Sequence, residues 1–155
     1  MTPNETLIHN FYTAFQKKDY RAMQEAYHPQ AEFSDPVFQG LSASEVKAMW
    51  QMLLTSATDL TLTFENVSAD ETTGRCHWEA WYTFTTSGRK VHNVIDAVFE
   101  FRDGKIYRHK DHFNFWRWSR MALGTPGILL GWTPVIKNKV RQTARRRLEK
   151  FMTAK

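Results

Sequence analysis

Three side chains in this 155-residue sequence are suited to moving protons: Asp35, His109 and Asp111. Asp35 follows an expected strand, at the point where the sheet should open towards a pocket. A partly apolar pocket raises the pKa of a carboxyl group and lets it take a proton from a carbon beside a carbonyl. His109 and Asp111 stand two residues apart on another expected strand and point the same way, so the carboxylate can fix the imidazole tautomer. All three are candidate catalytic residues.

Each candidate also has a purely structural interpretation. Asp35 precedes Pro36, and Asp-Pro is common turn chemistry in which the carboxylate accepts hydrogen bonds from backbone amides ahead of it. His109 and Asp111 fit equally well as a paired polar cluster at a sheet edge or a dimer interface. The sequence leaves both interpretations open.

No residue pattern indicates a metal or a cofactor. His109 and His112 are an odd number of residues apart on a strand and face opposite ways, and no helical His-x-x-x-His pair occurs. Cys76 lies within an apolar strand face and is typical of a small core residue. The glycines near the C-terminus lack a phosphate-cradling spacing. We expect no metal and no cofactor.

Length and composition fit a single domain, with 42% apolar and 24% charged residues. The aromatic content of 14% is high and favours a pocket or an interface in addition to an ordinary core. One cysteine excludes an internal disulfide, and the N-terminus lacks the basic start and apolar run of a secretion signal. We therefore expect a soluble, cytoplasmic protein.

Apolar periodicity predicts three helices followed by strands. Two helices begin at capping boxes with Thr2 and Ser42 as caps, and a shorter helix begins at Asp19 and ends near His28-Pro29. After position 59 the apolar period changes from 3.6 to 2. Strands are expected at 31–34, 60–65, 76–84, 91–101 and 106–116, the last four as an antiparallel meander. The fold class is therefore α+β, with the three helices packed in the concave face of a curved sheet.

Several strands are apolar on both faces, as where Val94 and Val98 oppose Ile95 and Phe99. The helices can cover only one of these faces. We expect the other face to meet a second copy of the chain in a homodimer, which would also account for Trp81. Isolated exposed aromatic side chains are the alternative.

Three segments carry a resemblance to a known family: 11–20 (FYTAFQKKDY), 31–40 (AEFSDPVFQG) and 99–106 (FEFRDGKI). In this order they resemble the nuclear transport factor 2-like (NTF2-like) superfamily, in the SnoaL-like branch related to polyketide cyclases and ketosteroid isomerases. The resemblance covers residues 4–118 and implies a cystatin-like cone over 1–118, with 119–155 as an extension. It does not fix an activity, because the superfamily hosts isomerases, cyclases, dehydratases, epoxide hydrolases and catalytically silent members.

The resemblance also suggests roles for the carboxylates. Asp35 falls on the general base of ketosteroid isomerases, and Asp111 resembles an aspartate that SnoaL-like cyclases use on the corresponding strand. The isomerases' oxyanion donors are missing, because their tyrosine position holds Phe11 and their late aspartate position holds Ala97. Asp96 is one residue off, which on a strand means the opposite face. A true ketosteroid isomerase is not expected, and Asp35 with Asp111 is the favoured acid/base pair.

Aromatic side chains from helices and sheet are the candidate pocket walls, although each also fits an ordinary core position. They are Phe11, Phe15, Trp50, Phe99 and Phe101. The matching ligand would be small, largely apolar and carbonyl-bearing.

The C-terminal extension differs in charge from the rest of the chain. Positions 134–155 hold eight Lys and Arg against one Glu, and the remainder holds 13 Lys and Arg against 15 Asp and Glu. This distribution argues against nucleic acid binding by the domain itself. An apolar loop over 118–134 is expected to precede a basic amphipathic helix from about Val135 to Met152. Its apolar stripe can dock on the domain or a dimer partner, lie on an anionic membrane with 128–132 inserted, or grip nucleic acid.

Two functions remain. A cofactor-independent lyase or isomerase would move protons on a small apolar carbonyl compound, with Asp35 and Asp111 as acid and base. A non-catalytic ligand-binding or dimerisation module would use its C-terminal helix to address a partner or a membrane surface. Convergence of both carboxylates on one cavity favours the enzyme, and capping of either by backbone amides favours the binding module.

Overall fold

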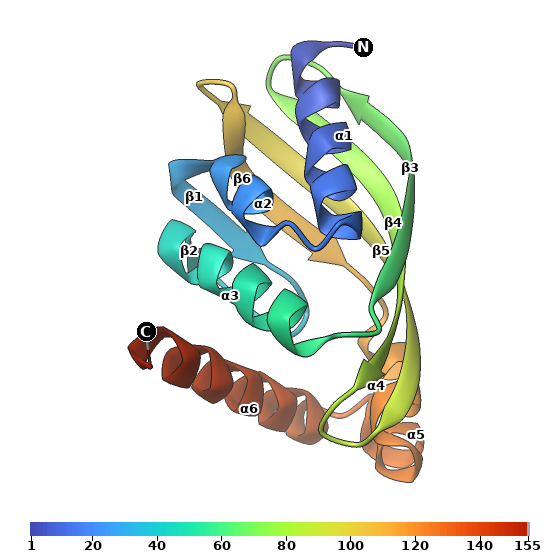
Figure 1. Cartoon of the computed structure of the whole chain (residues 1–155). Coiled ribbons are helices and arrows are strands. Elements are labelled where there is room, and N and C mark those ends of the chain that lie inside the picture. The colour runs from blue at the N-terminus through green and yellow to red at the C-terminus, as the bar shows by residue number, and fades with distance from the viewer. Residues whose placement is uncertain (155) are drawn as a thin grey trace.

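The computed structural model describes residues 1–154, so Lys155 of the expected extension lies outside the described residues. A six-stranded sheet curls around three N-terminal helices (Figure 1), and the α+β class predicted from the sequence is confirmed. The elements are α1 (Pro3–Gln16), α2 (Tyr20–Glu25), β1 (Tyr27–Ser34), β2 (Leu41–Ser42), α3 (Ala43–Ser56), β3 (Thr61–Ala69), β4 (Thr73–Phe84), β5 (Arg89–Arg102), β6 (Lys105–His112), α4 (Phe115–Leu123), α5 (Thr125–Leu130) and α6 (Pro134–Thr153).

Local sequence signals set where α1 and α3 begin. The Thr2 hydroxyl accepts a hydrogen bond from the Glu5 amide while the Glu5 carboxylate accepts one from the Thr2 amide, and Ser42 with Glu45 does the same. Both predicted capping boxes are confirmed. The predicted end of the second helix near His28 is wrong, because α2 stops at Glu25 and the following residues already pair as β1.

Sheet order brings the two candidate carboxylates together. The order is β2-β1-β6-β5-β4-β3, and β3 to β6 form the predicted antiparallel meander. β1 lies parallel to β6 with Ser34 opposite Lys110, so the next residues along, Asp35 and Asp111, leave the pair at the same end. The strand expected over 106–116 stops at 112, because the Asn114 side chain caps α4 by accepting from the Arg117 amide.

The segment expected to be an apolar loop is instead two short helices, α4 and α5, which pack closely through glycines. A Cβ atom on Gly127 would overlap the Ser119 carbonyl oxygen, and one on Gly131 would overlap the Ser119 hydroxyl. These glycines therefore serve helix packing.

α6 then runs back across the domain beside α3 (Figure 1). Leu148 is fully buried in the main core, so the apolar stripe docks on its own domain. Among residues 1–154, no helix is long and apolar enough to cross a bilayer.

The contact between α4 and α5 can be tested at Gly127. Helix propensity alone would make Gly127→Ala stabilising by about 1 kcal/mol. We expect it instead to destabilise the fold by about 1–3 kcal/mol, because the new methyl group meets backbone that cannot rotate away. Urea unfolding checks this, with Thr125→Ala on the exposed side of α5 as the matched control. A Gly127→Ala variant as stable as the wild type would show that the helices separate at little cost.

Candidate active site

A cavity of about 510 Å³ lies between the inner face of the sheet, α3 and α6. Its walls are mainly apolar, and they include Phe15 from α1, Trp50 from α3, and Ile136 and Val140 from α6. Such a hollow, with few polar groups, is typical of a small-molecule site. The polar side chains that line it include Asp35, Trp78, Tyr82, Asn93 and Asp111, and α6 adds Lys139 and Arg147.

The Asp35 side chain stabilises a turn, and its carboxyl group also has a raised pKa. Its Oδ1 accepts hydrogen bonds from the amides of Val37 at 2.7 Å and Phe38 at 2.6 Å, which is the turn chemistry expected of Asp-Pro. Burial nevertheless raises the pKa of its carboxyl to about 7, and the nearby charge of Asp111 adds to the increase. Oδ2 makes no hydrogen bond to any group in the described part of the chain. Near neutral pH this carboxyl can therefore both accept and return a proton.

Asp111 is oriented by a buried chain of hydrogen bonds. Trp50 Nε1 donates to the Tyr27 hydroxyl (2.9 Å), which contacts His109 Nδ1 (2.8 Å), and His109 Nε2 contacts Asp111 Oδ1 (3.0 Å). Indole N–H can only donate, so every group is satisfied only if Tyr27 donates to Nδ1 and His109 donates from Nε2. We therefore assign His109 as the neutral Nε2-protonated tautomer. It positions Asp111, whose second oxygen is left for the cavity.

Hydrogen-bond donors that the sequence analysis missed face the same cavity. The Tyr82 hydroxyl accepts from Trp118 Nε1 at 2.8 Å, which leaves its own hydrogen free to donate. Asn93 is only 7% exposed, and its side-chain amide has no hydrogen-bond partner among residues 1–154. Trp78 Nε1 is likewise buried and unpartnered. Asn93 had a readable signal, because it is the lone amide on the inward face that it shares with Val91 and other apolar residues.

The predicted aromatic walls divide into two groups. Phe15 and Trp50 line the cavity. Phe11 and Phe99 lie behind it, with ring centroids 5.8 and 4.5 Å from the His109 imidazole, and Phe101 stacks on Phe99. These three rings form the dry packing around the hydrogen-bond chain.

Ala97 and Asp96, the strand positions compared with the isomerases' oxyanion donor, point to opposite faces of the sheet, as expected for neighbouring residues on a strand. Ala97 points inward and is buried, whereas Asp96 lies on the outer face and pairs with His77 at 2.8 Å. Tyr12 is fully buried with an unpartnered hydroxyl, and it does not line the cavity. Tyr82 and Asn93 line the cavity instead and present hydrogen-bond donors to it.

The outer face of the sheet carries a separate cluster of titratable side chains. His77 contacts Glu79 as well as Asp96, and Glu79 also pairs with His92 at 2.7 Å. Side-chain N and O atoms of Glu65, His77 and Glu79 lie within 4.8 Å of one another. Glu79 is two residues after His77 and therefore points to the same face of the sheet, and Glu65 is opposite His77 on β3. A search of the sequence for pairs of histidines could not find this group. The hydrogen bond that His77 donates to the Asp96 carboxylate raises the pKa of His77, and the cluster is an ion-pair network remote from the cavity.

Solved structures share this fold. An NTF2-like protein of unknown function from Burkholderia pseudomallei is 19% identical, with a TM-score of 0.67 over 78% of this chain and 98% of that one. A Mycobacterium tuberculosis epoxide hydrolase of the LEH-like type is 15% identical (TM-score 0.63, 82% and 92%). IdmH, a putative polyketide cyclase from Streptomyces antibioticus, is 18% identical (TM-score 0.63, 76% and 96%).

The curved sheet and its inner helices have the NTF2-like fold, as the resemblance in the sequence predicted. The SnoaL-like domain model matches residues 8–109, and the chain belongs to that family. No curated protein matches the sequence.

The raised pKa of Asp35 predicts a pH-dependent cost in stability. The unfolded carboxyl titrates near 4, so wild-type stability falls between about pH 4 and pH 7, where only the folded state keeps the proton. Asp35→Asn keeps an oxygen for the turn and carries no charge. Relative to wild type, we expect it to gain about 1–3 kcal/mol in unfolding free energy between pH 5 and pH 8.

Asp70 is the matched control for this measurement. Its Oδ1 accepts from the amides of Thr72 and Thr73 in the same turn, but it is exposed and these bonds lower its pKa. Asp70→Asn should therefore lose stability at neutral pH, and this loss should shrink as pH falls below about 4. Parallel pH profiles for the two variants would contradict burial as the cause.

The hydrogen-bond chain can be tested at Tyr27. Tyr27→Phe strands both Trp50 Nε1 and His109 Nδ1, so we expect a loss of about 2–4 kcal/mol in urea unfolding. The ¹⁵N shifts of His109 should move as Nδ1 loses its donor. Tyr107→Phe is the control, because the Tyr107 hydroxyl makes no hydrogen bond. Unchanged His109 shifts in Tyr27→Phe would overturn the assigned tautomer.

Proposed function

We propose that this protein is a cofactor-independent isomerase or lyase that transfers protons on a small apolar carbonyl compound. The observation that carries the proposal is the meeting of Asp35 and Asp111 in one largely apolar cavity, with the pKa of Asp35 at about 7. Two proteins of similar fold, an epoxide hydrolase and a putative polyketide cyclase, support small-molecule chemistry in this type of cavity.

The residues fit a stepwise proton transfer. Asp35 Oδ2 takes a proton from the carbon beside the carbonyl, and the C–H electron pair moves into an enolate whose charge rests on oxygen. Tyr82 and Asn93 donate hydrogen bonds to that oxygen. Protonated Asp35 then returns this proton to a different atom of the enolate, directly or by way of the second oxygen of Asp111. In the lyase case the enolate collapses, the bond to the leaving group breaks with its electron pair, and the leaving group takes the proton. His109 contributes by holding Asp111 in position.

The alternative is a non-catalytic ligand-binding module, and one specific contact favours it. Two backbone amides already occupy Oδ1 of Asp35, as expected of a structural turn. The enzyme proposal therefore depends on the second oxygen of Asp35, and the experiment must separate proton transfer from binding.

We also propose that the chain works in the cytoplasm as a homodimer formed through the outer face of the sheet. Trp81, stacked on His92, and Val98 are 39% and 42% exposed there. Contact with a second copy would cover both. Light scattering measures the oligomeric state: we expect a dimer for the wild type and a monomer for Val98→Lys.

Proton transfer is tested by deuterium exchange. Aryl and polyketide-like ketones are incubated with the protein in D₂O near neutral pD, and loss of the α-proton signal is followed by NMR. We expect exchange above the buffer rate, reduced about 10²-fold or more in Asp35→Asn because a general base contributes roughly that factor. Asp70→Asn should exchange like the wild type.

Thermal shifts on the same compounds report binding independently of exchange. A ketone that stabilises wild type and Asp35→Asn equally, with no exchange above buffer, would refute proton transfer and support the binding module.

A further inference from the structure

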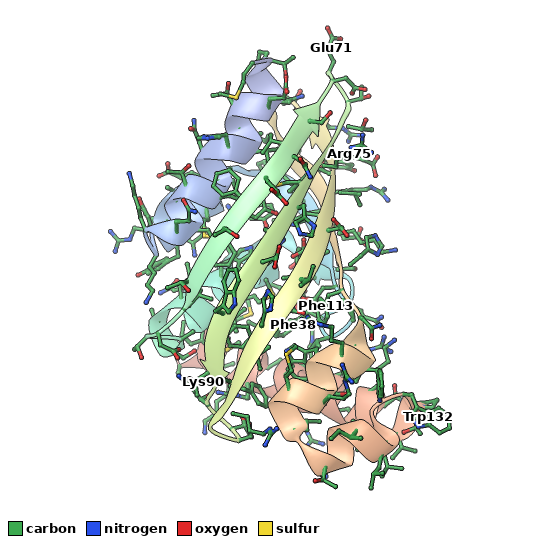
Figure 2. All side chains as sticks on the ribbon, turned by 90° about the vertical axis from the view of Figure 1, so that its right-hand side faces the viewer. Phe38, Glu71, Arg75, Lys90, Phe113 and Trp132 are labelled. Atoms are coloured by element: carbon green, nitrogen blue, oxygen red, sulfur yellow. The ribbon has the colours of Figure 1, made fainter. Side chains whose placement is uncertain are left out.

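Apolar side chains that face solvent gather at one end of the molecule. Of the nine large apolar side chains that are exposed among residues 1–154, six lie between positions 116 and 135. Trp132 is 72% exposed, and Figure 2 shows it projecting from the end of the molecule opposite Glu71. We call this set the α5 patch: Trp116, Ile128, Leu129, Leu130, Trp132 and Val135.

The backbone beneath the α5 patch makes its hydrogen bonds inside the protein. The last four carbonyls of a helix normally lack an intrahelical partner and turn to water. In α5 these carbonyls, of Gly127, Ile128, Leu129 and Leu130, accept in turn from the Gly131 amide, Trp116 Nε1, Trp132 Nε1 and Thr133. The Trp132 ring is thereby held outward with its own N–H already bonded. This end of the molecule can leave water without stranding those carbonyls.

The surroundings of the α5 patch are positive throughout. From His112 to Leu148 the chain carries eight Lys and Arg and no Asp or Glu. On α6, Lys139 and Arg146 are exposed at helical spacing from Val135, so a basic face continues directly from the apolar one. Arg120 lies over the Trp116 ring, 4.3 Å from its centroid. Arg145 is paired with Glu45 and Glu149, whereas Lys139 and Arg146 form no ion pair among residues 1–154. Apolar residues beside such unpaired cations are suited to an anionic lipid surface.

We propose that the α5 patch inserts into the headgroup–acyl boundary of an anionic bilayer, with the outer face of α6 lying along the headgroups. A second copy of the chain fits this surface less well. A symmetric dimer through the patch would oppose like charges, since the same basic segment would meet itself.

This orientation brings the cavity close to the lipid. Leu123, Pro126 and Ile136, from α4, α5 and α6, line the cavity at the end that carries the α5 patch. An apolar carbonyl compound dissolved in the bilayer would then have a short path to Asp35, an extension that rests on the proposed function. Membrane attachment itself is independent of turnover and is measured separately.

Vesicle sedimentation tests the attachment with the full chain. We expect binding to phosphatidylcholine vesicles containing phosphatidylglycerol to be at least about tenfold tighter than to phosphatidylcholine alone. Raising the salt concentration to about 0.5 M should weaken it several-fold through screening. Equal and weak binding to both vesicles would overturn the proposal.

Variants separate the apolar and charged contributions. Leu129→Gln with Trp132→Ala should lower partitioning into anionic vesicles about tenfold or more. Lys139→Glu with Arg146→Glu should remove the preference for phosphatidylglycerol. Lys17→Glu, exposed at the C-terminal end of α1, is the control and should bind like the wild type.

Folding and oligomeric state are monitored throughout. Melting temperatures should be close to wild type in both double variants, since these side chains are exposed. α-Proton exchange rates with water-soluble ketones should be close to wild type in Leu129→Gln with Trp132→Ala, because neither residue lines the cavity. Should Leu129→Gln with Trp132→Ala instead turn a dimer into a monomer while vesicle binding is absent in the wild type, the patch is a protein interface and the proposal fails.

Discussion

A chain of directed hydrogen bonds through the centre of the domain fixes where the chemistry sits. The Trp50 indole can only donate a hydrogen bond, so the Tyr27 hydroxyl accepts that bond and donates one to His109. The His109 imidazole in turn donates a hydrogen bond to Asp111. These hydrogen bonds join α3, β1 and β6. Displacing any one of them would strand a buried polar atom, at a cost of about 1–3 kcal/mol. The Asp111 carboxylate in the cavity is thus held by the same hydrogen bonds that hold α3 against β1 and β6.

Burial gives one turn motif two different outcomes in this chain. Asp35 and Asp70 each accept hydrogen bonds from amides two and three residues ahead. Those bonds lower the pKa of exposed Asp70, whereas burial outweighs them at Asp35 and raises its pKa to about 7. Turn chemistry and acid/base chemistry are therefore compatible interpretations of Asp35.

The C-terminal extension completes the cavity. Arg141 Nε donates to the Pro36 carbonyl at 2.9 Å, beside Asp35, and Arg145 pairs with Glu45 on α3 at 2.6 Å. These contacts hold the apolar stripe of α6 over the mouth of the cone. Arg147 of α6 donates a hydrogen bond to Thr86 in the β4–β5 hairpin. Three arginines of α6 therefore hold the helix on the domain, whereas Lys139 and Arg146 remain exposed.

The sequence by itself determined where α1, α2 and α3 begin and the alternation of inward and outward side chains along the central parts of β3, β4 and β5. Capping boxes and a two-residue period are local, and they require no knowledge of distant contacts. Family resemblance supplied the order of the elements and singled out Asp35 and Asp111. Only the tertiary structure decided that β1 lies parallel to β6, that α2 ends early so that Tyr27 enters the sheet, and that Tyr82 and Asn93 face the carboxylates. Those features depend on contacts between residues far apart in the chain, where burial and hydrogen-bond satisfaction override local preference.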